Sequence, residues 1–342
     1  MKILILGDLH LGKVVSELVS TYRNRVLYFV KSIIEKNNIN CIIQLGDFFD
    51  DRKNVSIEGY AETKKLLAKY FPPDIKFISI CGNHDATFKN TNDLCSTNEL
   101  ALPINIQTIL APSNDEETGF LYLPWINESN FEESERLINE SDSNFCFGHL
   151  EINGFAKIKG FNETSGLSSK LFNRFKKVFS GHFHLTQDIN NISYVGSIFQ
   201  LDRNDLHDTK RVMILDTDTE EVEEVRIPFT LFDKIVFNSE DDFDNKIVDK
   251  MDGKIVDVVF NCKRTLKREK FQDYLYENAL NCEMKVIDNS ELLQEDVILE
   301  NDSEQVIDLF KDYLRISEGY DDTRKEALKD LFVEIHNEVG GI

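Results

Sequence analysis

The sequence predicts an α/β fold, a two-sheet sandwich flanked by helices, followed by a small α/β capping domain and C-terminal helices. Two observations lead to this expectation. Short apolar, β-branched segments alternate with polar loops and segments of helical periodicity over the first 200 residues, which is typical of sheets covered by helices. Closely spaced strand-like segments and a more acidic composition follow. A chain of 342 residues is long enough for two or three domains.

Five apolar segments each lead directly into a polar loop that contains Asp, His or Asn. Apolar residues at helical spacing predict one helix near residues 26–34 and another near 60–70. Ligands of such folds bind beyond the carboxyl ends of the strands, so we expect the five loops to meet there. The five segments are Lys2–Leu6, Cys41–Leu45, Lys76–Ile80, Phe145–Phe147 and Lys177–Phe179.

Further strands are predicted after His184, and we expect a second sheet there that completes the sandwich. The segments lie at 192–195, 211–215 and 222–227, with a turn at 216–219. We therefore place one domain over residues 1–230.

The last third of the chain divides into three predicted parts. Residues 231–288 form a small α/β unit, with three strands and a helix near 267–279. Residues 289–302 form an acidic linker. Residues 303–342 carry two apolar stripes at helical spacing, which favours two helices that bind a partner.

Charge and cysteine content restrict the function. The formal net charge of −22 argues against unaided tight binding to a polyanion, and residues 231–342 alone carry 15 basic and 28 acidic side chains. The six cysteines form no C-x-x-C pair, which fits a reducing compartment. No apolar run approaches the length of a membrane span. We expect a cytoplasmic chain with no membrane partner.

Five of the seven histidines lie in the strand-end loops beside aspartate and asparagine. Divalent cations that activate water and bind phosphate oxygens prefer carboxylate and amide oxygens mixed with imidazole. Asp8 and His10 are two residues apart, as are His182 and His184, so each pair can supply two ligands to one centre. Asp47 could bridge two cations. The sequence therefore predicts a metal site.

The loops contain a set of motifs in a fixed chain order. They are Asp8-x-His10, Gly46-Asp47-x-x-Asp50, Gly82-Asn83-His84-Asp85, Gly148-His149 and Gly181-His182-x-His184. This set resembles the calcineurin-like metallophosphoesterase superfamily, and within it the SbcD-type DNA exonucleases. Residues 148–184 are especially similar to the catalytic subunit of tailed-phage recombination endonucleases. The resemblance covers residues 1–230 by motif and the rest by layout, and it implies that residues 231–288 are a capping domain that faces DNA.

The resemblance implies a role for each motif residue. His84 would face the scissile phosphate and protonate or stabilise the leaving oxygen, with Asp85 as a candidate orienting partner. Asp50 stands where some related nucleases carry histidine, and its role stays open. The implied ligands are Asp8, His10, Asp47 and His184 for one divalent ion, and Asp47, Asn83, His149 and His182 for the other, with Mn²⁺ first and Mg²⁺ second as candidates.

The resemblance also implies an activity and partners. The chain would be a 3′-to-5′ exonuclease on double-stranded ends and a single-strand endonuclease in DNA recombination, repair and replication. Its partner would be an ABC-type, SMC-like ATPase subunit bound through residues 303–342, and the nuclease domain would form a homodimer. If the chain is phage-encoded, it would act in the host cytoplasm.

Other readings remain open at this level. The chain could be a metallophosphatase acting on a phosphoprotein or a small phosphodiester, or a metal-free binding scaffold. The basic run at 263–270 could be a solvated helix face or a phosphate-contacting patch. We expect His207 and His336 to be solvent-exposed and to take no part in the chemistry.

Overall fold

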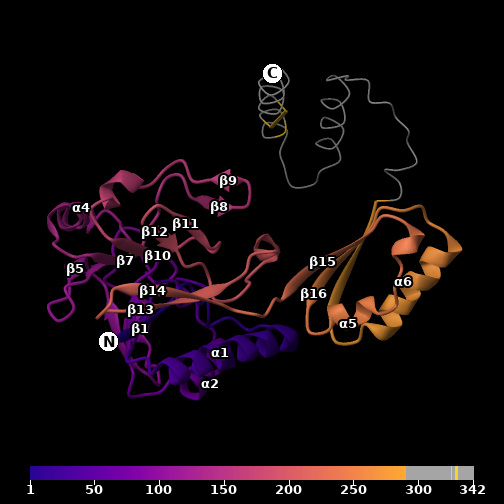
Figure 1. Cartoon of the computed structure of the whole chain (residues 1–342), viewed down its shortest axis with the longest axis horizontal. Coiled ribbons are helices and arrows are strands. Elements are labelled where there is room, and N and C mark those ends of the chain that lie inside the picture. The colour runs from indigo at the N-terminus through magenta and orange to yellow at the C-terminus, as the bar shows by residue number, and fades with distance from the viewer. Residues whose placement is uncertain (290–324, 326–327, 330–342) are drawn as a thin grey trace. The chain divides into compact units, whose positions relative to one another are not determined.

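The structure is a computed structural model that describes residues 1–289, 325 and 328–329. Residues Met1–Asp288 form one compact unit, drawn in colour in Figure 1. The predicted linker and helical segment lie outside the described residues, apart from 289, 325 and 328–329. His336 also lies outside them.

The first sheet has six strands in the order β14-β13-β1-β2-β3-β4. Strands β1 to β4 run parallel to one another. Alternation along β1 directs Leu4 and Leu6 to one face of the sheet and Ile3 and Ile5 to the other. The bounds are β1 Lys2–Leu6, β2 Cys41–Gln44, β3 Lys76–Ile80, β4 Asn105–Ile109, β13 Arg211–Asp216 and β14 Glu221–Arg226.

Two helices cover the Leu4 face of the first sheet and lie next to each other in Figure 1. Helix α1 (Glu17–Asn37) begins after Ser16, and helix α2 (Ile57–Tyr70) begins after Ser56. Each serine hydroxyl accepts a hydrogen bond from a backbone N–H of the first turn. Both helices were predicted from their apolar periodicity, and the apolar stripe of α1 is buried as expected.

The second sheet has the order β11-β12-β10-β7-β6-β5, and its inner face packs against the Ile3 face of the first sheet. The predicted two-sheet sandwich is therefore confirmed. The strands of the second sheet are β5 Ser113–Asn114, β6 Leu121–Leu123, β7 Phe145–His149, β10 Lys177–Gly181, β11 Gln187–Ile189 and β12 Ile192–Tyr194. Outside it lie α3 Ser96–Glu99, α4 Phe131–Glu140, β8 Ala156–Ile158, β9 Phe161–Asn162, η1 Ser169–Phe172 and η2 Arg203–Asp205.

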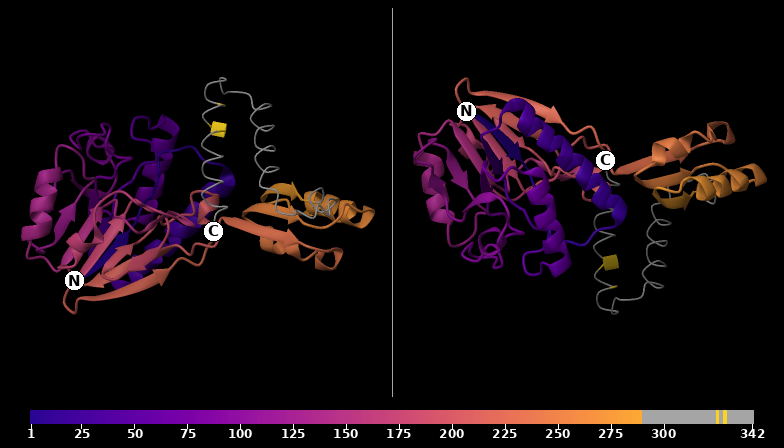
Figure 2. Two further views of the ribbon diagram at one scale, coloured as in Figure 1. Left: turned by 90° about the horizontal axis from the view of Figure 1, so that it is seen from above. Right: turned by 90° about the horizontal axis from the view of Figure 1, so that it is seen from below.

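The expectation that all late strands belong to the second sheet was wrong. Of the three predicted segments only 192–195, which is β12, joins it, whereas β13 pairs antiparallel with β1, from Lys2 opposite Asp216 to Ile5 opposite Met213. This register directs Met213 into the same inner core as Ile5, so the β13–β14 hairpin extends the first sheet. Figure 2 shows the N-terminus beside this hairpin, where the amino group of Met1 pairs with Asp218 at 2.9 Å.

A separate three-stranded parallel sheet, β15-β16-β17, follows with its own apolar core. Arg268 of the basic run lies in this core, 1% exposed, with its guanidinium 4.5 Å from the Phe260 ring centre and 2.6 Å from Asp288. Arg268 therefore belongs neither to a solvated face nor to a phosphate patch. The bounds are β15 Phe232–Phe237, η3 Glu240–Asp242, α5 Ile247–Met251, β16 Ile255–Phe260, α6 Leu266–Asn278 and β17 Glu283–Asp288.

None of the helices in the described ranges has the length and apolar character that a membrane span requires.

Candidate metal centre

The parallel strands of both sheets bring their carboxyl ends, and the motif loops, to one place. Asp8 and His10 follow β1, Asp47 follows β2, and Asn83 follows β3. From the second sheet, His149 is the last residue of β7, and His182 and His184 follow β10. All seven candidate ligands lie at this junction, where they form two clusters.

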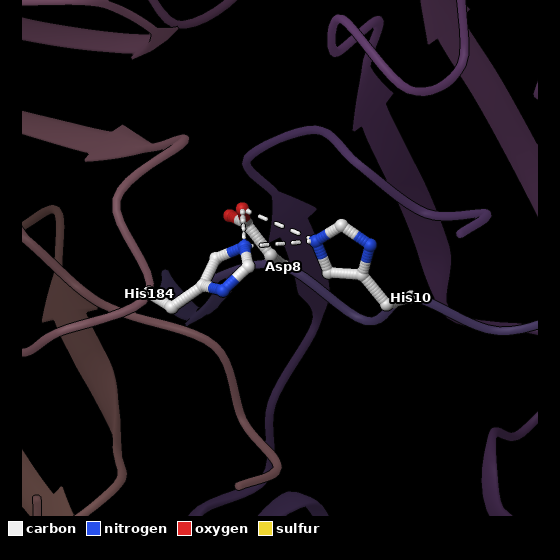
Figure 3. Close-up of side chains that lie close together, drawn as sticks. All are labelled: Asp8, His10 and His184. Carbon is white, nitrogen blue, oxygen red and sulfur yellow. Dashed lines mark hydrogen bonds and ion pairs between the residues drawn. The ribbon is translucent and has the colours of Figure 1, made fainter. Parts of the chain in front are cut away.

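The first cluster consists of Asp8, His10 and His184, whose ligand atoms lie within 4.8 Å of one another. Figure 3 shows both imidazole rings turned toward the Asp8 carboxylate. The Nε2 atoms of His10 and His184 are 3.1 Å apart, and each lies 3.8 Å from Asp8 Oδ2. Asp8 is fully buried and His10 is 3% exposed, whereas His184 is half-buried. These atoms can hold one cation.

The second cluster consists of Asp47, His149 and His182, again with ligand atoms within 4.8 Å. Asn83 joins it, since its Oδ1 lies 2.9 Å from His149 Nε2 and 2.8 Å from His182 Nδ1. An amide oxygen, a carboxylate and two imidazoles are a ligand set that suits divalent cations. This cluster can hold a second cation.

Asp47 faces both clusters with different oxygens. Its Oδ1 is 3.3 Å from His149 Nε2, and its Oδ2 is 3.8 Å from His10 Nε2. The side chain is only 2% exposed, so both oxygens are directed inward. Because a shared carboxylate lowers the repulsion between two neighbouring cations, Asp47 is positioned to bridge them.

The electrostatics of the site favour added positive charge in each cluster. Burial opposes protonation of His10, but ion pairing with Asp50 and Asp8 and the charge of Asp47 outweigh it and raise the pKa of His10 to about 10. Burial likewise opposes protonation of His149, but the charge of Asp47 raises its pKa to about 9. The carboxylates thus attract one positive charge per cluster, which is the behaviour expected of a cation site.

The other histidine of each cluster favours its neutral form. Burial and the charge of His149 lower the pKa of His182 to about 3. Burial also lowers the pKa of His184, although the charge of Asp8 opposes the shift. A neutral imidazole offers a lone pair, which is the form that binds a metal ion.

Carbonyl groups fix the tautomers of two histidines, because a carbonyl oxygen can only accept a hydrogen bond. Nδ1–H of His149 donates to the carbonyl of Leu45 at 2.8 Å, which directs Nε2 toward the second cluster. Nδ1–H of His84 donates to the carbonyl of Asp50 at 2.6 Å, which leaves Nε2 of His84 free to hold a proton. Outer hydrogen bonds of this kind orient ligand rings.

Asp85 does not orient His84 through a hydrogen bond. Its buried carboxylate accepts backbone N–H groups of Phe48 at 3.1 Å, Phe49 at 3.0 Å and Gly82 at 3.0 Å. Burial and the charge of Asp47 raise the pKa of this carboxyl, while the backbone N–H groups oppose the shift. Asp85 therefore ties together the loops that follow β2 and β3.

Asp50, whose role the sequence leaves open, serves two residues of the site. Its side-chain Oδ1 lies 3.4 Å from His10 Nδ1, and its main-chain carbonyl accepts the hydrogen bond from His84. Ion pairing with His10 lowers the pKa of Asp50 to about 2, although burial opposes the shift. Asp50 thus supports a ligand and the predicted proton donor together.

The ligand loops approach one another so closely that glycine is required. A Cβ atom on Gly181 would lie 2.5 Å from Asp8 Oδ1 and 2.5 Å from the Leu45 carbonyl oxygen. At Gly46, which has φ +100°, a Cβ atom would lie 2.3 Å from His149 Nδ1. The glycines of these motifs therefore permit the contact between loops that brings the ligands together.

Three residues that contact the site were not predicted from the sequence. Trp125 lies against the His182 ring, with ring centres 5.1 Å apart. The buried cation Arg23 donates to the His10 carbonyl at 3.1 Å, and the buried Lys210 ammonium donates to the His184 carbonyl at 2.8 Å. No motif marked them, although the single tryptophan, two residues after β6, could have drawn attention to Trp125. His207 is exposed, as expected.

The fold and the two clusters define a phosphoesterase that uses divalent metal ions. The family model named Calcineurin-like phosphoesterase matches residues 1–186, and the chain belongs to this family, whose members bind two divalent metals. "Exonuclease subunit 1" of Enterobacteria phage T4 is 30% identical over 344 residues, which cover 98% of this chain and 99% of that protein. The chain is therefore a metal-dependent hydrolase of phosphate esters.

The similarity to solved structures is weaker. An archaeal phosphodiesterase is 15% identical, with a TM-score of 0.31, and the match covers 66% of this chain and 99% of that one. A Pseudomonas putida nuclease is also 15% identical, with a TM-score of 0.30 and coverage of 65% and 87%. The family assignment rests on the two sequence matches.

Proposed function

We propose that this chain is a two-metal DNA nuclease, a 3′-to-5′ exonuclease on double-stranded ends and a single-strand endonuclease. The observation that carries the proposal is the Asp47 carboxylate, whose two oxygens face two separate clusters of metal-binding side chains. Similarity over almost the whole length to a phage exonuclease subunit favours DNA as the substrate.

The proposed ligands divide between two ions. Asp8, His10 and His184 would hold one, Asn83, His149 and His182 the other, and Asp47 would bridge them. When bound, Mn²⁺ or Mg²⁺ would supply Lewis-acid activation of water and of the phosphate oxygens. The donor set of carboxylates, an amide oxygen and imidazoles fits either ion, and we place Mn²⁺ first.

The chain's own residues supply orientation and a proton. The Asp50 carbonyl holds Nδ1 of His84, so Nε2 can carry a proton to the leaving oxygen of the cleaved strand. The Leu45 carbonyl holds Nδ1 of His149, so the ring does not have to reorient when an ion binds. Asp85 keeps the loops after β2 and β3 in register.

We also propose an ABC-type, SMC-like ATPase subunit as the partner, bound through residues 303–342. Two amphipathic stripes at helical spacing support this proposal, and so does the designation of the phage relative as a subunit. With a net charge of −22, the chain needs a partner to supply affinity for DNA. A homodimer through residues 1–230 and action in DNA recombination, repair and replication in the host cytoplasm complete the proposal.

The test compares Asp47→Asn with the wild type and with Asp142→Asn, a control that removes the charge of an exposed carboxylate. Cleavage of end-labelled single- and double-stranded DNA is measured with Mn²⁺ and with Mg²⁺, beside the number of ions bound per chain. We expect Asp47→Asn to lose both cleavage and paired ion binding, and Asp142→Asn to retain them. Two bound ions and full cleavage in Asp47→Asn would refute the bridging role.

The same assay separates the alternatives. Hydrolysis of nitrophenyl phosphate without cleavage of DNA would favour a metallophosphatase, and binding of no divalent ion by the wild type would favour a scaffold.

A further inference from the structure

Trp125, the single tryptophan of the chain, lies beside the second cluster and has no part in the mechanism proposed above. Its ring centre is 5.1 Å from that of His182, with 38° between the ring planes. It is 6.1 Å from the ring centre of His149, with 71° between the planes. One indole thus packs against both imidazoles of this cluster.

The backbone of Trp125 is held on both sides. Its N–H donates to the carbonyl of Cys81 at 2.8 Å. Its carbonyl accepts three side-chain amides, from Asn92 at 2.9 Å, Asn127 at 3.3 Å and Asn130 at 3.0 Å. Asn92 is 3% and Asn130 7% exposed, so water competes little for these hydrogen bonds. The backbone that carries the indole is therefore fixed.

These hydrogen bonds also connect Trp125 to the ligands of the second cluster. Cys81 directly precedes Gly82 and Asn83, so the bond to its carbonyl holds the backbone of Trp125 beside the Asn83 loop. His182 Nδ1 lies 2.8 Å from Asn83 Oδ1. Rotation of the His182 ring away from this arrangement would require the ring to move against the indole.

We propose that Trp125 is a positioning residue of the second cluster, whose indole holds the rings of His182 and His149 so that their free nitrogens face a divalent cation. The inference rests on the proposed two-metal function and adds to it a residue outside the ligand set. Loss of a residue that orients metal ligands typically weakens metal affinity about 10- to 100-fold. The indole should therefore affect one of the two ions and not the other.

The first experiment measures Mn²⁺ binding to the full chain by equilibrium dialysis and electron paramagnetic resonance. We expect Trp125→Leu to bind one ion as tightly as the wild type and the other about 10- to 100-fold more weakly. Trp125→Phe, which keeps an aromatic ring against His182, should restore most of the affinity.

Phe172→Leu is the matched control, because it removes a fully buried ring that packs with Phe175 in the core outside the second sheet. It should lower the melting temperature and leave both ions bound with wild-type affinity.

The second experiment uses the indole itself as the reporter. Mn²⁺ is paramagnetic and quenches an adjacent fluorophore, so titration of the wild type should quench the tryptophan emission as the second cluster fills. His149→Gln should abolish this quenching, and His10→Gln should retain it, because His10 belongs to the first cluster. Zn²⁺, which is diamagnetic, is the control ion and should not produce the quenching.

Each outcome bears on one of the two proposals. Wild-type affinity for both ions in Trp125→Leu would overturn the inference while leaving the two-metal function intact. An equal loss of one ion in Phe172→Leu would also overturn it, because reduced stability would then explain the effect. Binding of no Mn²⁺ by the wild type would refute the two-metal function itself.

Discussion

Replacement of His84 by glutamine should separate proton donation from metal binding. The His84 ring belongs to neither ligand cluster, and its Nδ1–H donates to the Asp50 carbonyl at 2.6 Å. Its backbone N–H donates to Asp47 Oδ1 at 2.7 Å, and this bond does not depend on the side chain. A glutamine amide can also donate to the Asp50 carbonyl but cannot deliver a proton at neutral pH. The change should therefore preserve the site and remove its acid.

The size of the effect follows from the role of a positioned acid. General acid catalysis contributes about 10²- to 10⁴-fold to a rate. At about 1.36 kcal/mol per factor of ten, the barrier to cleavage should rise by about 2.7–5.4 kcal/mol. Because Asp47 and both clusters are unchanged, His84→Gln should still bind two ions per chain.

The assay is single-turnover cleavage of a labelled single-stranded oligonucleotide at saturating Mn²⁺, together with ion stoichiometry. His149→Gln is the comparison, because His149 Nε2 lies 3.3 Å from the Asp47 carboxylate and its loss should weaken one ion. Loss of an ion in His84→Gln would show that His84 is a ligand. An unchanged rate would show that the leaving oxygen needs no proton from this ring.

Three further predictions follow from the structure and the sequence pattern. The raised pKa values of His10, about 10, and His149, about 9, mean that both hold protons at pH 7.5 until an ion displaces them. Mn²⁺ binding should therefore release about one proton per ion and tighten as pH rises toward 9, and calorimetry in buffers of different ionisation enthalpy measures this release. Gly181→Ala should lower stability by about 1–3 kcal/mol and weaken Mn²⁺ binding, since the added Cβ meets Asp8 Oδ1 at 2.5 Å; a wild-type melting temperature and affinity would contradict this. A chain that ends at Asn301 should keep Mn²⁺-dependent cleavage of short single-stranded DNA and no longer co-purify with the ATPase; undiminished co-purification would locate the docking surface elsewhere.

The sequence was informative wherever one residue's role depends on its own strand and loop. Asp8 and His10 could be placed at a strand end because the apolar run Lys2–Leu6 and the polar loop are adjacent in the chain. Because parallel strands bring such loops to one edge of the sheet, this prediction does not require knowing which strands pair. The candidate ligands could therefore be named before their distances were known.

Features that depend on long-range pairing could not be predicted in the same way. The apolar pattern of residues 211–216 fits an inner strand of either sheet, and only its register with β1 assigns it to the first. Nothing in the sequence around Lys210 predicts that it is buried, yet its ammonium is fully buried between Asp205 at 2.6 Å and Asp208 at 2.8 Å. Its contact with the His184 carbonyl joins residues that are 26 positions apart.

The backbone of the site shows why these long-range contacts matter for metal binding. The φ values of His10, Asp47 and His182 are 44°, 51° and 86°. Residues other than glycine rarely adopt this region. Such conformations cost about 1–3 kcal/mol each, and they persist where neighbouring structure holds them.

Each of these three strained residues is held by a contact with another ligand loop. The backbone N–H of His10 donates to the Asp47 carbonyl at 3.1 Å, and that of His182 donates to both oxygens of Asp8 at 3.2 Å. Because the loops restrain one another, the two candidate cation sites are formed by the protein's own hydrogen bonds. Little of the binding energy of an ion is then needed to organise its ligands.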